Sequence, residues 1–239
     1  MSTGPSIQKH YWAPFEPMVK KVEELVASKP RVLEVGPGQK PFPAATEYVD
    51  WREFQELKGK PVHALNINQD QLPLADKSFD FAYCRHTLED LYNPFLMCRE
   101  MDRVAKAGYI ETPSAIAEAA RGVDYRSPPW RGYHHHRYLV WVENDTLMFL
   151  PKYPVLEHID LGEWEPRLIE MLNTHPLFWN TYYFWEGTLK YRLLEHDKDF
   201  RILKDYPQRA MAAIEQSREY TQQIAAKLFP GTLEKRATA

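Results

Sequence analysis

The chain has 239 residues, of which 44% are hydrophobic, so it can bury a substantial core and intrinsic disorder is excluded as its overall state. Its formal net charge of −3 excludes the strongly basic balance typical of nucleic-acid binding. Two cysteines make no disulfide framework, and no stretch approaches the roughly 18 apolar residues of a membrane span. We therefore expect a cytoplasmic protein without a membrane span.

The first half of the chain alternates predicted helices and strands. Residues 15–28 place apolar side chains on one stripe, which predicts an amphipathic helix. Short apolar runs bounded by turn residues predict five strands, at residues 31–35, 46–51, 61–67, 79–84 and 107–113, with a helix at 92–105. Buried-type strands separated by helices or loops favour a parallel α/β sheet.

The second half has a different pattern. Two hairpins are predicted, at residues 138–150 around Asn144-Asp145 and at 178–195 around Glu186-Gly187. A helix is predicted at 207–229, where it either covers the sheet or forms a homodimer. With no repeat and no long linker, we expect a single domain over residues 1–239. Its core would take in about 18–115 and 176–205, and an accessory or lid segment about 116–175.

The stretch RVLEVGPGQKPFP, residues 31–43, reads as a strand entering a ligand-binding turn. Gly36 and Gly38 allow close backbone approach and left-handed conformations. A dinucleotide site would add a third glycine and a helix N-terminus for the pyrophosphate, but Pro41 and Pro43 occupy that segment. We expect a turn without a pyrophosphate site, the alternative being a tight turn with no ligand.

The end of the second strand suggests which cofactor would suit this turn. Asp50 closes that strand and can accept both hydroxyls of a ribose, and Trp51 after it can cover an adenine face. S-adenosylmethionine carries adenosine but no phosphate, and it matches this combination.

Residues 72–94, LPLADKSFDFAYCRHTLEDLYNP, resemble the class I S-adenosylmethionine-dependent methyltransferases. Members commonly carry Leu-Pro-Phe, an acid-rich turn, Phe-Asp before the fourth strand and His-x-Leu-Glu-His after it. Here Asp90 replaces the last histidine, and Lys106-Ala107-Gly108 replaces the usual Pro-Gly-Gly. The resemblance covers roughly residues 30–115.

The resemblance implies a Rossmann-like, seven-stranded, mostly parallel sheet that ends in an antiparallel hairpin. It also implies S-adenosylmethionine as the cofactor, with the methionine moiety against the glycine turn, the ribose on the acid of the second strand and the adenine beside residues 68 and 69. The cofactor-binding residues expected on this basis are Glu34, Gly36, Gly38, Asp50, Trp51, Asn68, Gln69 and Cys84.

Residues 126–143, RSPPWRGYHHHRYLVWVE, contain the main candidates for a general base. In an extended chain His134 and His136 share one face and converge on a cleft. His86, beside the segment expected to face the sulfonium, is a further catalytic candidate. The alternative is a surface loop. A metal site would need a third ligand, for which His158 and His175 are available but not assigned, so we predict no metal.

These observations predict methyl transfer to a small-molecule or sugar-type acceptor, on oxygen or nitrogen. Two alternatives stay open: a non-catalytic S-adenosylmethionine-binding module or partner subunit, and an NAD(P)-dependent Rossmann oxidoreductase. The sequence does not identify the acceptor.

Overall fold

A computed structural model describes residues 15–54, 57, 59–126, 129–194 and 200–233. The chain divides into two compact units, which are described separately. The sheet unit contains Glu16–Thr112 and Tyr182–Tyr191, and the helical unit contains Pro113–Thr181 and Arg192–Ala239 together with Met1–Phe15. The prediction of a single domain stays a prediction.

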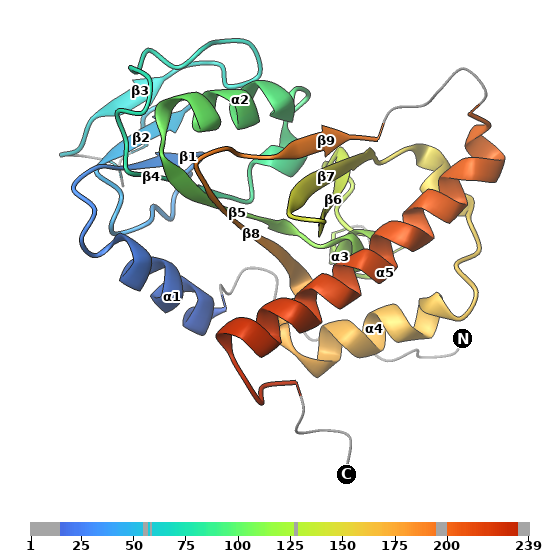
Figure 1. The fold of residues 1–239 in the computed structure, drawn as a ribbon. Helices are drawn as coiled ribbons and strands as arrows, with labels where there is room; N and C mark the ends of the chain where they lie inside the picture. Colours follow the sequence, from blue (N-terminus) through green and yellow to red (C-terminus); the bar gives the residue numbers. More distant parts are fainter. Residues whose placement is uncertain (1–14, 55–56, 58, 127–128, 195–199, 234–239) are drawn as a thin grey trace. The chain divides into compact units, whose positions relative to one another are not determined.

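The sheet unit is built on a six-stranded sheet with the order β3-β2-β1-β4-β5-β8 (Figure 1). The pairs β1/β2, β1/β4, β2/β3 and β4/β5 are parallel, which confirms the predicted α/β architecture. The chain leaves β1 for β2 on one side and returns to β4 on the other, so the strand order reverses at β1. The strands are β1 Val32–Val35, β2 Glu47–Asp50, β3 Val62–Ala64, β4 Phe81–Arg85, β5 Ala107–Pro113 and β8 Asn180–Glu186.

The described residues of the sheet unit contain two α-helices, α1 (Glu16–Val26) and α2 (Pro94–Val104), with a short 3-10 helix η2 (Leu88–Asp90) before the second. The stripe predicted for α1 is buried at Met18, Val22 and Val26. Asn93 caps α2 by accepting a hydrogen bond from the Leu96 backbone N–H at 3.3 Å.

The helical unit carries the second sheet, with the order β6-β7-β9. The predicted turn at Asn144-Asp145 has φ of 48° and 57°, the left-handed geometry of a two-residue hairpin, and this hairpin is confirmed. Helix α5 packs on β6 and α3. The elements are α3 Ala115–Ala119, β6 Tyr138–Glu143, β7 Thr146–Pro151, η3 Pro154–His158, α4 Trp164–Thr174, η4 Pro176–Trp179, β9 Tyr191–Leu193 and α5 Ile202–Leu228.

The predicted hairpin around Glu186-Gly187 is wrong. Strand β8 ends the large sheet beside β5, whereas β9 joins the second sheet beside β7, so the large sheet has six strands among the described residues rather than seven. The backbone N–H of Gly187 donates to Lys106, and that of Leu189 to the Asp102 carboxylate. Because these hydrogen bonds tie residues 187–189 to α2 and to the residue before β5, the chain does not fold back to pair with β8.

Helix α5 begins at Ile202 and not at residue 207 as predicted, and Pro207 lies inside it. The missing N–H of Pro207 leaves the carbonyl of Leu203 without its helical donor, and Leu203 is 78% exposed, so water can satisfy that carbonyl. Among the described helices, none combines the length and apolar character needed to cross a membrane.

Candidate functional site

The glycine turn lies at the carboxyl end of β1. Gly36 has φ of 75°, and its N–H donates to the Val49 carbonyl of β2 at 2.8 Å. A Cβ added to Gly36 would lie 2.1 Å from Thr87 Oγ1, so this glycine is required for packing. Gly38 has φ of 51°, and an added Cβ there would meet nothing within 4 Å. The backbone at Gly38 therefore faces open space that a ligand can use.

Asp50 joins this turn to the end of β2. Its Oδ2 accepts from the Gly38 N–H at 3.1 Å, and its Oδ1 accepts from the Trp51 N–H at 2.7 Å. Burial raises the pKa of the Asp50 carboxyl, although these two amides act to lower it. Trp51 is 64% exposed, with the Arg52 guanidinium 4.4 Å from its ring centre. Asp50 therefore holds a fixed orientation at the sheet edge, beside an exposed aromatic ring.

Glu34 is buried and organises the segment after the turn. Its Oε2 accepts from the Phe42 N–H at 2.7 Å, and the Phe42 ring stacks on Tyr83 at 4.2 Å between ring centres. Burial raises the pKa of Glu34 to about 8. Residues 36–46 contain no helix, which confirms the prediction that this turn lacks the helix end of a dinucleotide site.

The other predicted cofactor-binding residues have structural contacts of their own. The side-chain oxygen of Asn68 accepts from the backbone N–H groups of Tyr92 at 2.7 Å and Asn93 at 3.3 Å. Gln69 is exposed in the same turn. Cys84 is fully buried in β4, and burial raises the pKa of its thiol well above the usual value, so it is not a nucleophile.

His86 follows β4 with φ of 50°, an uncommon conformation for a residue other than glycine. Its Nδ1 lies 3.4 Å from Glu89 Oε1 and its Nε2 lies 3.4 Å from Glu111 Oε1. Burial alone would lower the pKa of His86, but Glu111 and Glu89 raise it above the usual value. The raised pKa favours the protonated ring, which counts against His86 as a general base.

Glu111 is the centre of this cluster. Arg85 Nε donates to it at 3.0 Å and the Tyr109 hydroxyl at 2.5 Å. Burial alone would raise its pKa, but His86 and Arg85 hold the pKa of Glu111 at about 2. Glu111 was not predicted from the sequence, although an acid at the end of the fifth strand was a usable signal.

His134 and His136 do not share one face, because residues 133–136 form a turn and not an extended strand. His136 is buried, with its Nδ1 2.6 Å from Glu118 Oε1, whereas His134 is exposed, with its Nδ1 3.0 Å from Asp124 Oδ2. Glu118 also accepts from Lys152 Nζ at 2.6 Å. The predicted convergence of the two imidazoles is therefore wrong.

Glu118 and Asp124 were missed because they belong to α3 and the loop after it, where no local pattern marks them. Burial alone would raise the pKa of Glu118, but Lys152 and His136 hold it at about 2. Partial burial of the ring and the neighbouring imidazoles lower the pKa of His135 to about 4. Although burial acts against it, the Arg126 amide and His134 lower the pKa of Asp124.

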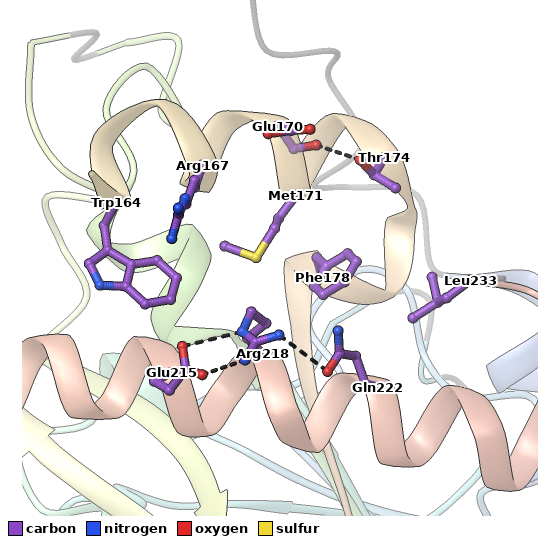
Figure 2. Close-up of a pocket in the computed structure, with 10 residues that line it drawn as sticks. All are labelled: Trp164, Arg167, Glu170, Met171, Thr174, Phe178, Glu215, Arg218, Gln222 and Leu233. Carbon is purple, nitrogen blue, oxygen red and sulfur yellow. Dashed lines mark hydrogen bonds and ion pairs between the residues drawn. The ribbon is translucent and has the colours of Figure 1, made fainter. Parts of the chain in front are cut away.

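The helical unit also contains a cavity of about 590 Å³ between α4 and α5 (Figure 2). Arg218 is paired there with Glu215 and hydrogen-bonds Gln222 at 3.4 Å. None of the residues that line the cavity was assigned to the cofactor or to catalysis. Its apolar part consists of Trp164, Met171, Phe178 and Leu233.

Residues 45–110 match the family model described as a methyltransferase domain. The match runs from the start of β2 into β5 and covers well under half of the chain. This segment is therefore of the class I, Rossmann-like methyltransferase type, and the family implies S-adenosylmethionine as its cofactor. No curated protein sequence matches the chain.

Parts of the chain also match solved structures. A SAM-dependent methyltransferase from Thermotoga maritima is 26% identical, with 42% of this chain and 51% of that chain covered and a TM-score of 0.34. The YcgJ protein from Bacillus subtilis is 20% identical, with 40% and 50% covered and a TM-score of 0.34. A SAM-dependent methyltransferase from Mesorhizobium loti is 15% identical, with 57% and 63% covered and a TM-score of 0.38. The chain spans about half the length of the first two, and scores this low transfer no activity to it.

Proposed function

We propose, on the premise that residues 45–110 form a class I methyltransferase segment, that this protein transfers a methyl group from S-adenosylmethionine. The observation that carries the proposal is the hydrogen bond from the Gly38 N–H to the Asp50 carboxylate. It puts an oriented carboxylate and an open glycine backbone at the point where the strand order reverses, which is where open α/β sheets bind ligands.

These residues suit a phosphate-free adenosine. The Asp50 carboxylate accepts the backbone N–H groups of Gly38 and Trp51, and an ionised carboxylate has about four lone-pair sites, so it keeps acceptor capacity for a ribose hydroxyl. Trp51 offers an exposed ring for the adenine, to which the family resemblance also assigns Asn68 and Gln69. The Asn68 oxygen already accepts two backbone N–H groups, so its amino group is the better placed to contact adenine. A pyrophosphate would find no helix end in residues 36–46.

The chain's own residues must then orient the acceptor, exclude water and accept its proton where it has one to lose. The cofactor, when bound, supplies the activated methyl group. Among the predicted bases, His136 has the better arrangement, because the buried carboxylate of Glu118 orients its ring through Nδ1. We propose a small-molecule or sugar-type acceptor, methylated on oxygen or nitrogen. A reducing, cytoplasmic setting agrees with two free cysteines and stays a prediction.

Calorimetry with S-adenosylmethionine and S-adenosylhomocysteine tests the cofactor site. We expect one site per chain and an affinity at least about tenfold lower in Asp50→Asn, because the ribose loses a charged acceptor. The matched control is Asp70→Asn, an exposed carboxylate that accepts the Asn66 N–H, and it should bind like the wild type. Equal affinity in Asp50→Asn and the wild type, or titration by reduced nicotinamide cofactor instead, would contradict the proposal.

Release of S-adenosylhomocysteine across a panel of acceptors tests catalysis. With an active acceptor, His136→Ala should lower kcat more than His134→Ala, since only the buried ring is oriented by a carboxylate. Unchanged turnover in the double variant would rule out both histidines as bases. Cofactor binding without turnover on any acceptor would favour the non-catalytic binding module.

A further inference from the structure

Three potential metal ligands converge in the helical unit. They are Asp124, on the loop after α3, and His134 and His135, in the turn before β6. One ligand atom from each lies within 4.8 Å of those of the other two. The closest pair is His134 Nδ1 and Asp124 Oδ2 at 3.0 Å, and the two imidazole centres are 5.4 Å apart with their planes at 75°.

This set of donors selects a class of metal. Two imidazole nitrogens and one carboxylate oxygen suit first-row transition metals and zinc, whereas magnesium and calcium prefer oxygen ligands throughout. Three protein ligands leave a coordination position open, as in zinc sites that bind water or a small ligand. No third ligand for the histidine run could be assigned from the sequence. Asp124 supplies it, whereas His175 instead accepts the Leu177 N–H at 3.2 Å.

Neighbouring contacts hold two sides of the cluster. Asp124 Oδ1 accepts the Arg126 N–H at 2.9 Å, so Oδ2 is the oxygen directed at His134. His136, next to His135, is fixed by Glu118 at 2.6 Å. Contacts of this kind behind the ligands orient them for a metal.

The turn itself is held close to α3 by a glycine. Gly132 has φ of 56°, and a Cβ added there would lie 2.6 Å from the Cα of Glu118. Only glycine therefore permits this approach, which brings the histidine turn against the helix that precedes the Asp124 loop. The positions of the two imidazoles relative to Asp124 follow from packing inside one compact unit.

We propose that Asp124, His134 and His135 bind one dication of the zinc, cobalt or nickel type, through Asp124 Oδ2 and one nitrogen of each ring. Ligand atoms about 2.0–2.1 Å from a tetrahedral metal lie about 3.4 Å apart. Separations of up to 4.8 Å must therefore shorten, and the exposed imidazoles can rotate to do so. The metal replaces the His134–Asp124 hydrogen bond. The proposal does not depend on the methyltransferase assignment.

The test uses the full chain without an affinity tag, after treatment with a chelator. Titration with Co²⁺ should produce visible ligand-field absorption that saturates near one equivalent, and Zn²⁺ should displace it. In calorimetry with Zn²⁺, His135→Ala and Asp124→Asn should each weaken binding at least about tenfold. The matched controls, His158→Ala and Asp160→Asn, change an exposed histidine and an exposed aspartate of the same unit and should bind like the wild type.

Two outcomes would overturn the proposal: absorption that does not saturate near one equivalent, and His135→Ala binding Zn²⁺ as tightly as the wild type. His135 is exposed, so its alanine variant should fold, and thermal melting of the metal-free proteins checks this. If Asp124→Asn fails to fold, the result for His135→Ala decides. Calorimetry with S-adenosylmethionine on His135→Ala reports separately on the cofactor site.

Discussion

Two glutamates, one in each unit, are almost completely buried, and yet their pKa values shift in opposite directions. Glu34 is 3% exposed, receives a hydrogen bond from the Phe42 N–H, and its pKa rises to about 8. Glu118 is 0% exposed but contacts Lys152 and His136, and its pKa falls to about 2. Burial favours the neutral acid in both, and only Glu118 has partners, the Lys152 ammonium and the hydrogen-bonded His136 ring, that reverse this effect. The charge of a buried acid is therefore decided by its partners.

The largest expected effect on stability comes from removing the Glu118 carboxylate. Glu118→Ala leaves Lys152 and His136 buried without their carboxylate, so the free energy of unfolding should fall by about 3–5 kcal/mol. Glu118→Gln should lose less, because its side chain can still hydrogen-bond both partners. Denaturant unfolding followed by circular dichroism measures the loss. Glu163→Ala removes an exposed ion pair with Arg167 and should have no measurable effect. A Glu118→Ala protein as stable as the wild type would show that the three residues do not interact.

The second prediction concerns Glu34 and the pH dependence of stability. Its folded pKa of about 8 lies above the usual 4.5, so between these values the folded state holds a proton that the unfolded state has lost. The free energy of unfolding should therefore fall as pH rises from about 4.5 to 8, by at most a few kcal/mol. Glu111 and Glu118, with folded pKa near 2, act oppositely: their stabilisation is complete above about 4.5 and is lost as pH falls toward 2.

Unfolding measured from pH 3 to 9 tests both directions. Glu34→Gln keeps an oxygen for the Phe42 N–H and should remove the decline above pH about 5 while keeping the acid-side loss. Glu23→Gln, an exposed control on α1, should keep the wild-type profile. An unchanged decline in Glu34→Gln would mean that another group causes it.

The two glutamates also show which parts of the site could be predicted. Glu34 lies eight residues from Phe42, inside one short motif, so a pattern of strand, acid and glycines was enough to find it. Glu118 meets His136 and Lys152 at separations of 18 and 34 residues, and no local pattern records those pairings. For the same reason the five parallel strands were predicted correctly, since each depends on its own apolar run. The pairing of β8 and β9 was not, because it depends on distant hydrogen bonds.

The smallest expected effect concerns the glycine turn, where the need for glycine depends partly on a residue that is distant in the sequence. Gly36→Ala puts a Cβ 2.1 Å from Thr87 Oγ1, which belongs to the loop after β4, and keeps a left-handed φ. We expect the free energy of unfolding to fall by roughly 2–3 kcal/mol. Gly38→Ala carries only the backbone strain, about 1 kcal/mol, because its Cβ meets nothing.

A double-variant cycle separates the two causes. The three atoms nearest to the added methyl of Gly36→Ala all belong to Thr87. In the Thr87→Ala background the two closest of them, Oγ1 and Cγ2, are absent, and the Cβ of residue 87 stays at 2.9 Å. Gly36→Ala should therefore cost less there, with a coupling free energy of about 1 kcal/mol, whereas Gly38→Ala should show no coupling to Thr87. Equal costs for the two glycines, without coupling, would mean that backbone strain alone requires glycine in this turn. The sequence would then have sufficed to explain both positions. A measured coupling instead assigns Gly36 to packing against the loop after β4 and leaves Gly38 as the glycine that the ligand approaches.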